Sequence, residues 1–153
     1  MNNKITSIIQ ASIDVKQQLL QNETIKQTIA DCVNIIVTAF NNGNKVLFCG
    51  NGGSAADAQH LAAEFSGRFY IDRKALPAEA LHCNTSYLTA VGNDYSYDVI
   101  YARLLDGIGN AGDVIIGLST SGNSANIIKA FEVAKNKNIT TSGFTGETGG
   151  KMK

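Results

Sequence analysis

The feature that most constrains this sequence occurs twice: a short apolar run leads into a loop of glycine and hydroxyl residues, and then into a helix. Residues 45–49, KVLFC, are followed by GNGGSA at 50–55. Residues 113–118, DVIIGL, are followed by STSGNS at 119–124. Short apolar runs bounded by glycine are typical of buried strands. Because such strands alternate with helical segments, the sequence predicts an α/β fold built on a parallel sheet.

The rest of the chain continues this α/β pattern. Apolar residues recur every three or four positions through the first forty residues, which predicts long helices before the first strand. The other expected elements are strands at 75–82 and 139–144, helices at 85–91, 97–108 and 124–137, and a turn at 92–94. We predict one domain over residues 1–153, with a helical segment (1–42) and an α/β core (45–153). The core is expected to be a three-layer sandwich around a flavodoxin-like parallel sheet.

The last expected strand is followed only by a glycine-rich loop at residues 146–150 and three further residues. A sheet of this kind needs a helix over each face, and one more helix, with or without a further strand, would be expected after this loop. We therefore expect a C-terminal strand or helix of the complete fold to be missing from this sequence.

The composition narrows the classes of function. Thirteen basic and thirteen acidic side chains give a formal charge of zero, and no basic block suggests nucleic acid as a partner. No apolar run approaches the roughly 20 residues of a membrane span, and the N-terminus lacks the apolar region of a signal peptide. The three cysteines are widely spaced, which suits a reducing compartment. A cytoplasmic protein without nucleic-acid or membrane partners is expected.

The second loop suits a phosphate group. Ligands of open parallel sheets lie beyond the carboxyl ends of the strands, and a helix N-terminus favours an anion there. The loop places four hydroxyl residues within six positions: Ser119, Thr120, Ser121 and Ser124. The alternative is an ordinary serine or threonine helix cap, which needs only one of the four.

The first loop fits the pattern G-x-G-x-x-A, a weak variant of the dinucleotide-binding fingerprint. That fingerprint requires an acidic residue at the end of the next strand. The next expected strand ends at His82, and the two residues after it are Cys83 and Asn84, so the acid is absent. No Gly-Lys-Ser/Thr follows the loop either, which excludes a Walker A motif. Nucleotide binding is therefore disfavoured.

The helix after the first loop carries His60 and Glu64 one turn apart on one face, with Asp57 three residues before His60. Three roles are possible for this pair. It could supply two ligands to a divalent metal, it could be an oriented proton acceptor, or it could be an exposed helix pair without a function. Two ligands from one helix make half a zinc site.

Residues 49–68, CGNGGSAADAQHLAAEFSGR, resemble the phosphoheptose isomerase family of sugar isomerase (SIS) domains. Matches to the same family are VGND at 91–94, LSTSGNSAN at 118–126 and TGETGGKM at 145–152. The resemblance covers essentially the whole chain. It implies a cytoplasmic homotetramer that uses zinc and converts D-sedoheptulose 7-phosphate to D-glycero-D-manno-heptose 7-phosphate. This product leads to the heptose of bacterial surface glycans such as lipopolysaccharide or capsule.

The resemblance also implies roles for single residues. His60 and Glu64 would bind zinc, and Glu64 would also be the catalytic base. Substrate contacts would come from Asn51, Gly52, Gly53, Ser54, Glu64, Asn93 and Asp94, and the phosphate would be held by Ser119, Thr120, Ser121 and Ser124. The family completes its site with a glutamine and a second histidine on a C-terminal helix. Without that helix the chain would carry half of the zinc ligands, and we expect it to turn over poorly alone.

Two other functions stay open at this point. A non-catalytic SIS module could bind a sugar phosphate, or serve as a tetrameric partner of a bacterial replication initiator, without needing His60 and Glu64. An isomerase could also act on another phosphosugar, such as a hexosamine or arabinose phosphate. Because both His60 and Glu64 are present, the heptose isomerase is favoured.

Overall fold

The computed structural model describes residues 2–153, which form two compact units, one ending at Ile35 and the other spanning Ile36–Lys153. The first unit holds α1 (Asn2–Gln21) and most of α2 (Glu23–Asn41). Asn22 lies between these helices and caps α2, since its side-chain oxygen accepts from the N–H of Ile25 at 3.0 Å. None of the helices within residues 2–153 is both long and apolar enough to cross a bilayer.

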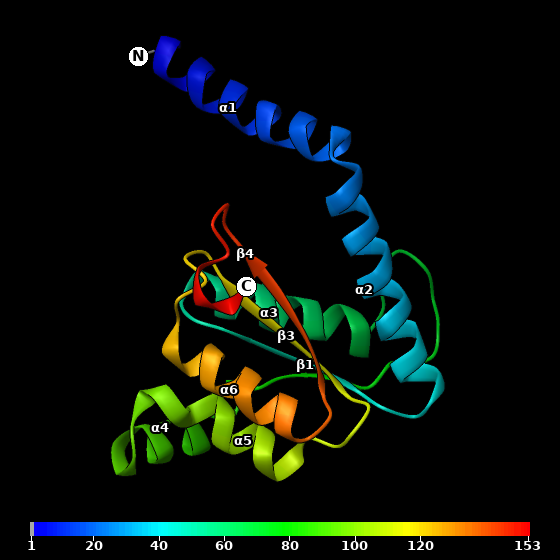
Figure 1. Cartoon of the computed structure of the whole chain (residues 1–153), viewed down its shortest axis with the longest axis vertical. Helices are drawn as coiled ribbons and strands as arrows, with labels where there is room; N and C mark the ends of the chain where they lie inside the picture. The colour runs from blue at the N-terminus through cyan, green and yellow to red at the C-terminus, as the bar shows by residue number, and fades with distance from the viewer. Residues whose placement is uncertain (1) are drawn as a thin grey trace. The chain divides into compact units, whose positions relative to one another are not determined.

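The second unit is built on one sheet, which Figure 1 shows as β1, β3 and β4 running side by side. Its strands are β1 (Val46–Gly50), β2 (Ala78–Ala80), β3 (Val114–Ser119) and β4 (Thr140–Thr145). All neighbouring strands pair in parallel, and their order is β2-β1-β3-β4. This is the order of the flavodoxin-like class, so the predicted parallel sheet is confirmed.

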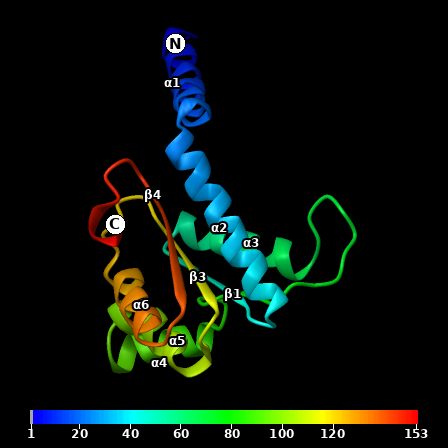
Figure 2. The same cartoon turned by 45° about the vertical axis from the view of Figure 1, so that its right-hand side comes forward.

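Helices cover both faces of this sheet, as Figure 2 shows, with α3 on one side and α5 and α6 on the other. Their bounds are α3 (Gly53–Ser66), α4 (Thr85–Asp94), α5 (Ile100–Ile108) and α6 (Ala125–Asn136), with short 3₁₀ turns η1 (Tyr97–Val99) and η2 (Gly150–Met152). The α/β core is therefore the three-layer sandwich that the sequence predicted.

The core follows from the alternation of side chains along the central strands. In β1, Val46 and Phe48 pack with α3 and the end of α2, whereas Leu47 and Cys49 pack with α5 and α6. Every residue of β1 is buried. Both faces of β1 thus bury apolar side chains, which explains why its sequence is a continuous apolar run rather than an alternating one.

Two predicted elements differ from the structure. The strand expected over 75–82 shrinks to Ala78–Ala80, because it is an edge strand that pairs only with β1. The turn expected at 92–94 is wrong, since these residues form the last turn of α4. Helix α4 continues through Gly92 because Val91 is buried and its carbonyl accepts from the N–H of Tyr95 at 3.1 Å. Tertiary packing here outweighs the weak helix propensity of glycine.

Candidate functional site

The two glycine and hydroxyl loops lie next to one another because they follow neighbouring strands. Residues of β1 and β3 pair in register up to Gly50 and Leu118. The first loop leads into α3 and the second into α6. Both helix N-termini therefore stand at the same carboxyl edge of the sheet, which is where open α/β folds bind their ligands.

The first loop is shaped by Gly52, whose φ of 56° lies in the left-handed region that favours glycine. Gly52 is also the N-cap residue of α3, and no side-chain hydrogen bond caps the helix there. The carbonyl of Gly50 accepts a hydrogen bond from the buried Tyr101 hydroxyl. Burial raises the pKa of Tyr101, which keeps this hydroxyl protonated as a donor.

The second loop brings two of its four hydroxyl groups into contact. Ser119 is 4% exposed, and its Oγ lies 2.9 Å from the Oγ of Ser124. Ser121 is exposed, and its Oγ accepts from the N–H of Asn123 at 3.2 Å. The side chain of Ser124 makes no capping bond to α6. An ordinary helix cap therefore does not account for these hydroxyls.

The segment after β4 holds the second loop in place, which sequence reasoning did not anticipate. The N–H of Gly146 donates to the Thr120 carbonyl at 2.9 Å, and the N–H of Met152 donates to the Gly122 carbonyl at 3.1 Å. Gly122 has a left-handed φ of 64°, and a Cβ there would meet the carbonyl of Gly149. The glycines at these positions let two backbones approach closely.

The sequence pair His60 and Glu64 forms as predicted on α3. His60 Nε2 lies 3.3 Å from Glu64 Oε1, and the two side chains are 74% and 30% exposed. Asp57, one turn earlier, is exposed. Arg73, which sequence reasoning missed, donates from Nη2 to the Glu64 carbonyl at 2.8 Å and from Nη1 to the Phe65 carbonyl at 2.9 Å. It satisfies carbonyls at the C-terminus of α3 and so fixes the end that carries Glu64.

These two side chains fit part of a zinc site. An imidazole nitrogen and a carboxylate oxygen are both ordinary zinc ligands, and their heavy atoms lie close enough to share one ion. Within residues 2–153, however, no cluster of three or more His, Cys, Asp or Glu side chains could hold a metal ion. The part of the chain described here therefore offers two ligands from one helix face.

Two further predicted residues lie at the end of α4. Asn93 and Asp94 are exposed, and Asn93 Nδ2 donates to Asp94 Oδ1 at 3.0 Å. Just beyond them, the Tyr97 hydroxyl donates to Asn51 Oδ1 of the first loop at 3.2 Å. The segment after α4 is thus tied to the first loop by Tyr97, although the structure shows no direct role for Asn93 or Asp94.

His82 follows β2, near the position where a dinucleotide-binding fingerprint would need an acidic residue. Its Nδ1 is buried and has no hydrogen-bond partner among the described residues. Burial lowers the pKa of His82, so its neutral form is favoured.

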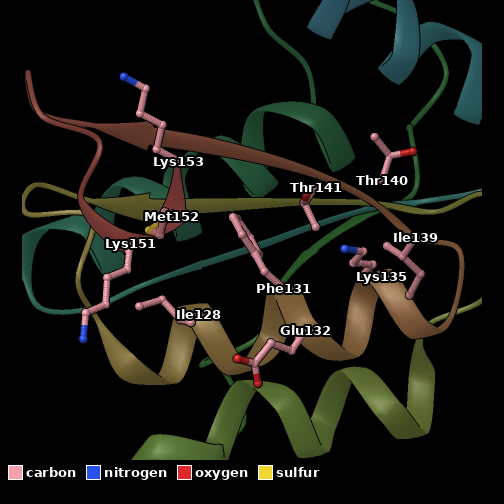
Figure 3. A pocket seen from close by; sticks show the side chains of 10 residues that line it. All are labelled: Ile128, Phe131, Glu132, Lys135, Ile139, Thr140, Thr141, Lys151, Met152 and Lys153. Carbon is pink, nitrogen blue, oxygen red and sulfur yellow. The ribbon is translucent and has the colours of Figure 1, made fainter.

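A cavity of about 620 Å³ lies elsewhere, between α6 and β4. Figure 3 shows Phe131 and Ile128 of α6 facing Met152 across it. Lys135, Lys151 and Lys153 also line it. None of the predicted site residues lines this cavity, so the candidate site is the pair of loops and not the hollow beside β4.

Comparison with known proteins agrees with this geometry. The SIS domain family model matches residues 10–146. The chain is 53% identical over 152 residues to the phosphoheptose isomerase of Aneurinibacillus thermoaerophilus, which covers 99% of this chain and 77% of that protein. It is also 53% identical over 153 residues to the phosphoheptose isomerase of Clostridium acetobutylicum, and this match covers 100% of this chain and 78% of that protein.

Solved structures show the same likeness. The structure of the phosphoheptose isomerase from Neisseria gonorrhoeae superposes with a TM-score of 0.89 at 40% identity, over 99% of this chain and 78% of that one. The structure of a phosphoheptose isomerase from Francisella tularensis superposes with a TM-score of 0.92 at 35% identity, over 98% of this chain and 78% of that one. Fold, loops and sequence agree: the chain belongs to the SIS domain family and, within it, to the phosphoheptose isomerases, a family of isomerase enzymes.

Proposed function

We propose that this chain interconverts D-sedoheptulose 7-phosphate and D-glycero-D-manno-heptose 7-phosphate in the cytoplasm, at the entry to bacterial surface heptose. The observation that carries this proposal is the meeting of two features at one sheet edge. The hydroxyl loop after β3 adjoins the loop that leads into the helix with His60 and Glu64. A non-catalytic sugar-phosphate module would need the first feature alone.

The second loop is the proposed phosphate grip. Ser119, Ser121 and Ser124 offer hydroxyl donors beside the N-terminus of α6, which adds backbone N–H groups and the positive end of the helix dipole. Thr120 completes the set. The glycines of the first loop, Gly52 and Gly53, leave its backbone open for the sugar, with Asn51 and Ser54 beside them.

Glu64 is the proposed base for the aldose–ketose step. Moving a proton between C1 and C2 of the sugar needs an acceptor near both carbons, and the partly buried carboxylate of Glu64 suits this task. Arg73 binds the backbone carbonyl of Glu64 and so holds the helix end from which the carboxylate projects. Asn93 and Asp94 are proposed to contact the sugar as well. Zinc, bound through His60 and Glu64, would polarise the oxygens on the reacting carbons and stabilise the charge that develops there.

The test is a calorimetric titration with sedoheptulose 7-phosphate, together with an isomerase assay with and without added zinc. We expect the chain to bind the phosphosugar without zinc. Turnover is expected to require added zinc and to stay slow, because two protein ligands hold a metal weakly. Ser121→Ala should weaken phosphosugar binding about tenfold, the value of one good hydrogen bond to a charged group, and leave zinc binding unchanged. His60→Ala should lose zinc and keep phosphosugar binding.

The controls separate the parts of this proposal. Ser7→Ala, on α1, should change neither readout. If Ser121→Ala lost zinc while His60→Ala kept it, the roles of the two loops would be reversed. Turnover that survives a chelator would exclude zinc, and stronger binding of a hexosamine phosphate or arabinose phosphate would reject the heptose substrate.

We extend the proposal to assembly as a homotetramer. Along α1, one face carries Ile5, Ile8, Ile9, Ile13 and Leu20, and each of these side chains is 42% to 70% exposed. A helix with an apolar face is stable in water only when another surface covers it. A second copy of this chain is the proposed cover, because the family resemblance implies a tetramer.

Light scattering on a sizing column tests the assembly. Ile8→Asp should reduce the mass from a tetramer to a smaller species, because it places a charge on the apolar face. The matched control, Gln18→Asp, lies on the opposite face of α1 and should keep the tetramer. A wild-type chain that elutes as a monomer would contradict the proposal.

A further inference from the structure

Two asparagines join the two loops through their side chains. Asn51 Nδ2 donates to Asn126 Oδ1 at 2.9 Å, and Asn126 Nδ2 donates back to Asn51 Oδ1 at 2.9 Å. Asn51 belongs to the loop after β1, whereas Asn126 is the second residue of α6, just after the hydroxyl loop. Asn126 is 3% exposed. A buried amide is costly unless it is hydrogen-bonded, and the pair gives the side-chain oxygen and nitrogen of Asn126 one hydrogen bond each.

The pair determines what Asn51 can offer to a ligand. An asparagine side chain can accept two hydrogen bonds at its oxygen and donate two from its nitrogen. Asn51 Oδ1 accepts from Asn126 and from the Tyr97 hydroxyl, so its acceptor capacity is used. Asn51 Nδ2 gives one hydrogen to Asn126. One N–H is left, and Asn51 therefore meets a ligand as a donor.

The sheet alone would not fix this orientation. The ladder between β1 and β3 ends at Gly50 and Leu118, one residue before Asn51. Beyond the ladder, the Tyr101 hydroxyl holds the Gly50 carbonyl, and Asn126 and Tyr97 hold the Asn51 side chain. Three contacts from outside the loop thus converge on two consecutive residues at the sheet edge.

We propose that Asn126 is a positioning residue: it holds the Asn51 amide as a hydrogen-bond donor to the sugar part of the substrate. This inference rests on the proposed function, because it assigns the remaining N–H of Asn51 to a sugar oxygen. Asn126 acts only through Asn51, since its own side chain is buried. Tyr97, which is 54% exposed, supports the same orientation by donating to Asn51 Oδ1.

A double-mutant cycle tests this role. The variants are Asn51→Ala, Asn126→Ala and the double variant, with Tyr97→Phe as a milder change. Dissociation constants are measured by calorimetry for sedoheptulose 7-phosphate and for inorganic phosphate. We expect each single alanine variant to weaken phosphosugar binding about tenfold, and the double variant to be no weaker than Asn51→Ala. Inorganic phosphate, which lacks the sugar, should bind within about threefold of wild type in all variants.

Several results would overturn the inference. Additive losses, about a hundredfold in the double variant, would mean that Asn126 acts independently of Asn51. Equal losses for phosphosugar and inorganic phosphate would mean that the substitution disturbs the hydroxyl loop itself. If Asn126→Ala fails to fold, Tyr97→Phe decides: a twofold to fivefold loss of phosphosugar binding alone supports the role, and no change rejects it.

The outcome for the wild-type chain separates the two proposals. A wild-type chain that binds no phosphosugar overturns the proposed function, and this inference falls with it. A wild-type chain that binds the phosphosugar, with Asn126→Ala binding equally well, overturns the inference alone and leaves the proposed function intact.

Discussion

Replacing Gly50 with alanine is expected to destabilise the α/β core by about 3 kcal/mol or more and to abolish phosphosugar binding. A Cβ at Gly50 would lie 2.6 Å from the carbonyl carbon of Ser54 and 3.0 Å from the nitrogen of Ala55. Both atoms belong to the backbone of the first turn of α3, so no side-chain rotation relieves the overlap. The whole helix would have to move away from β1, and it carries His60 and Glu64.

The measurement is urea unfolding followed by circular dichroism, together with calorimetric binding of sedoheptulose 7-phosphate. Gly107→Ala is the matched control, because Gly107 lies exposed in α5 and a Cβ there meets nothing within 4 Å. That change should leave binding intact and raise the free energy of unfolding by up to about 1 kcal/mol, through better helix propensity. A Gly50→Ala chain with wild-type stability and binding would show that α3 is not held against β1 as the structure has it.

Much of the fold could be predicted because the decisive signals are local. The apolar run at residues 46–49 and its counterpart at 114–116 need no distant information to be identified as buried strands. The side-chain pair of His60 and Glu64 also follows from local geometry, since residues four apart on a helix are neighbours. Once the sheet is parallel, the two loops must share one edge.

The contacts that complete the site are not local, and the sequence did not reveal them. Asn51 and Asn126 pair across 75 residues of chain, and no spacing rule connects them. Tyr97 and Arg73 reach the site region from loops and turns whose paths no periodicity predicts. A buried asparagine near a helix N-terminus is a signal that could have been noticed only after the helix face was known.

One buried carboxylate links the N-terminal ends of β1 and β3, at the sheet edge opposite the two loops. Asp113, the residue just before β3, is 1% exposed. Its Oδ2 accepts from Lys45 Nζ at 2.6 Å and from the N–H of Asn110 at 2.8 Å. Its Oδ1 accepts from the N–H of Lys45 at 3.0 Å and from Asn44 Nδ2 at 3.2 Å. The carboxylate thus ties the residues before β1 to the start of β3.

Asp113→Ala is expected to lower the free energy of unfolding at pH 7 by about 3 to 5 kcal/mol. The change leaves the Lys45 ammonium, whose side chain is 25% exposed, without its counter-charge, and it removes the acceptor for three other donors. Urea unfolding measures the difference. Asp106→Asn is the control, because the Asp106 side chain is exposed and its carboxylate lies 3.7 Å from Lys137 Nζ. This change should alter stability by less than about 1 kcal/mol.

The Asp113 carboxylate also makes the free energy of unfolding depend on pH, because its pKa differs between the folded and unfolded chains. Burial alone would raise the pKa of Asp113, but the hydrogen bonds from Lys45, Asn110 and Asn44 outweigh it and hold the pKa below its ordinary value of 3.8. At a pH between the lowered pKa of the folded chain and the ordinary value of 3.8, the carboxyl group is protonated in the unfolded chain and ionised in the folded chain. The contribution of Asp113 is therefore complete above about pH 4 and is lost as the pH falls through the lowered pKa. The stability difference between wild type and Asp113→Ala should shrink in acid, and a difference that grows as the pH falls would show that the carboxyl group is protonated in the folded state.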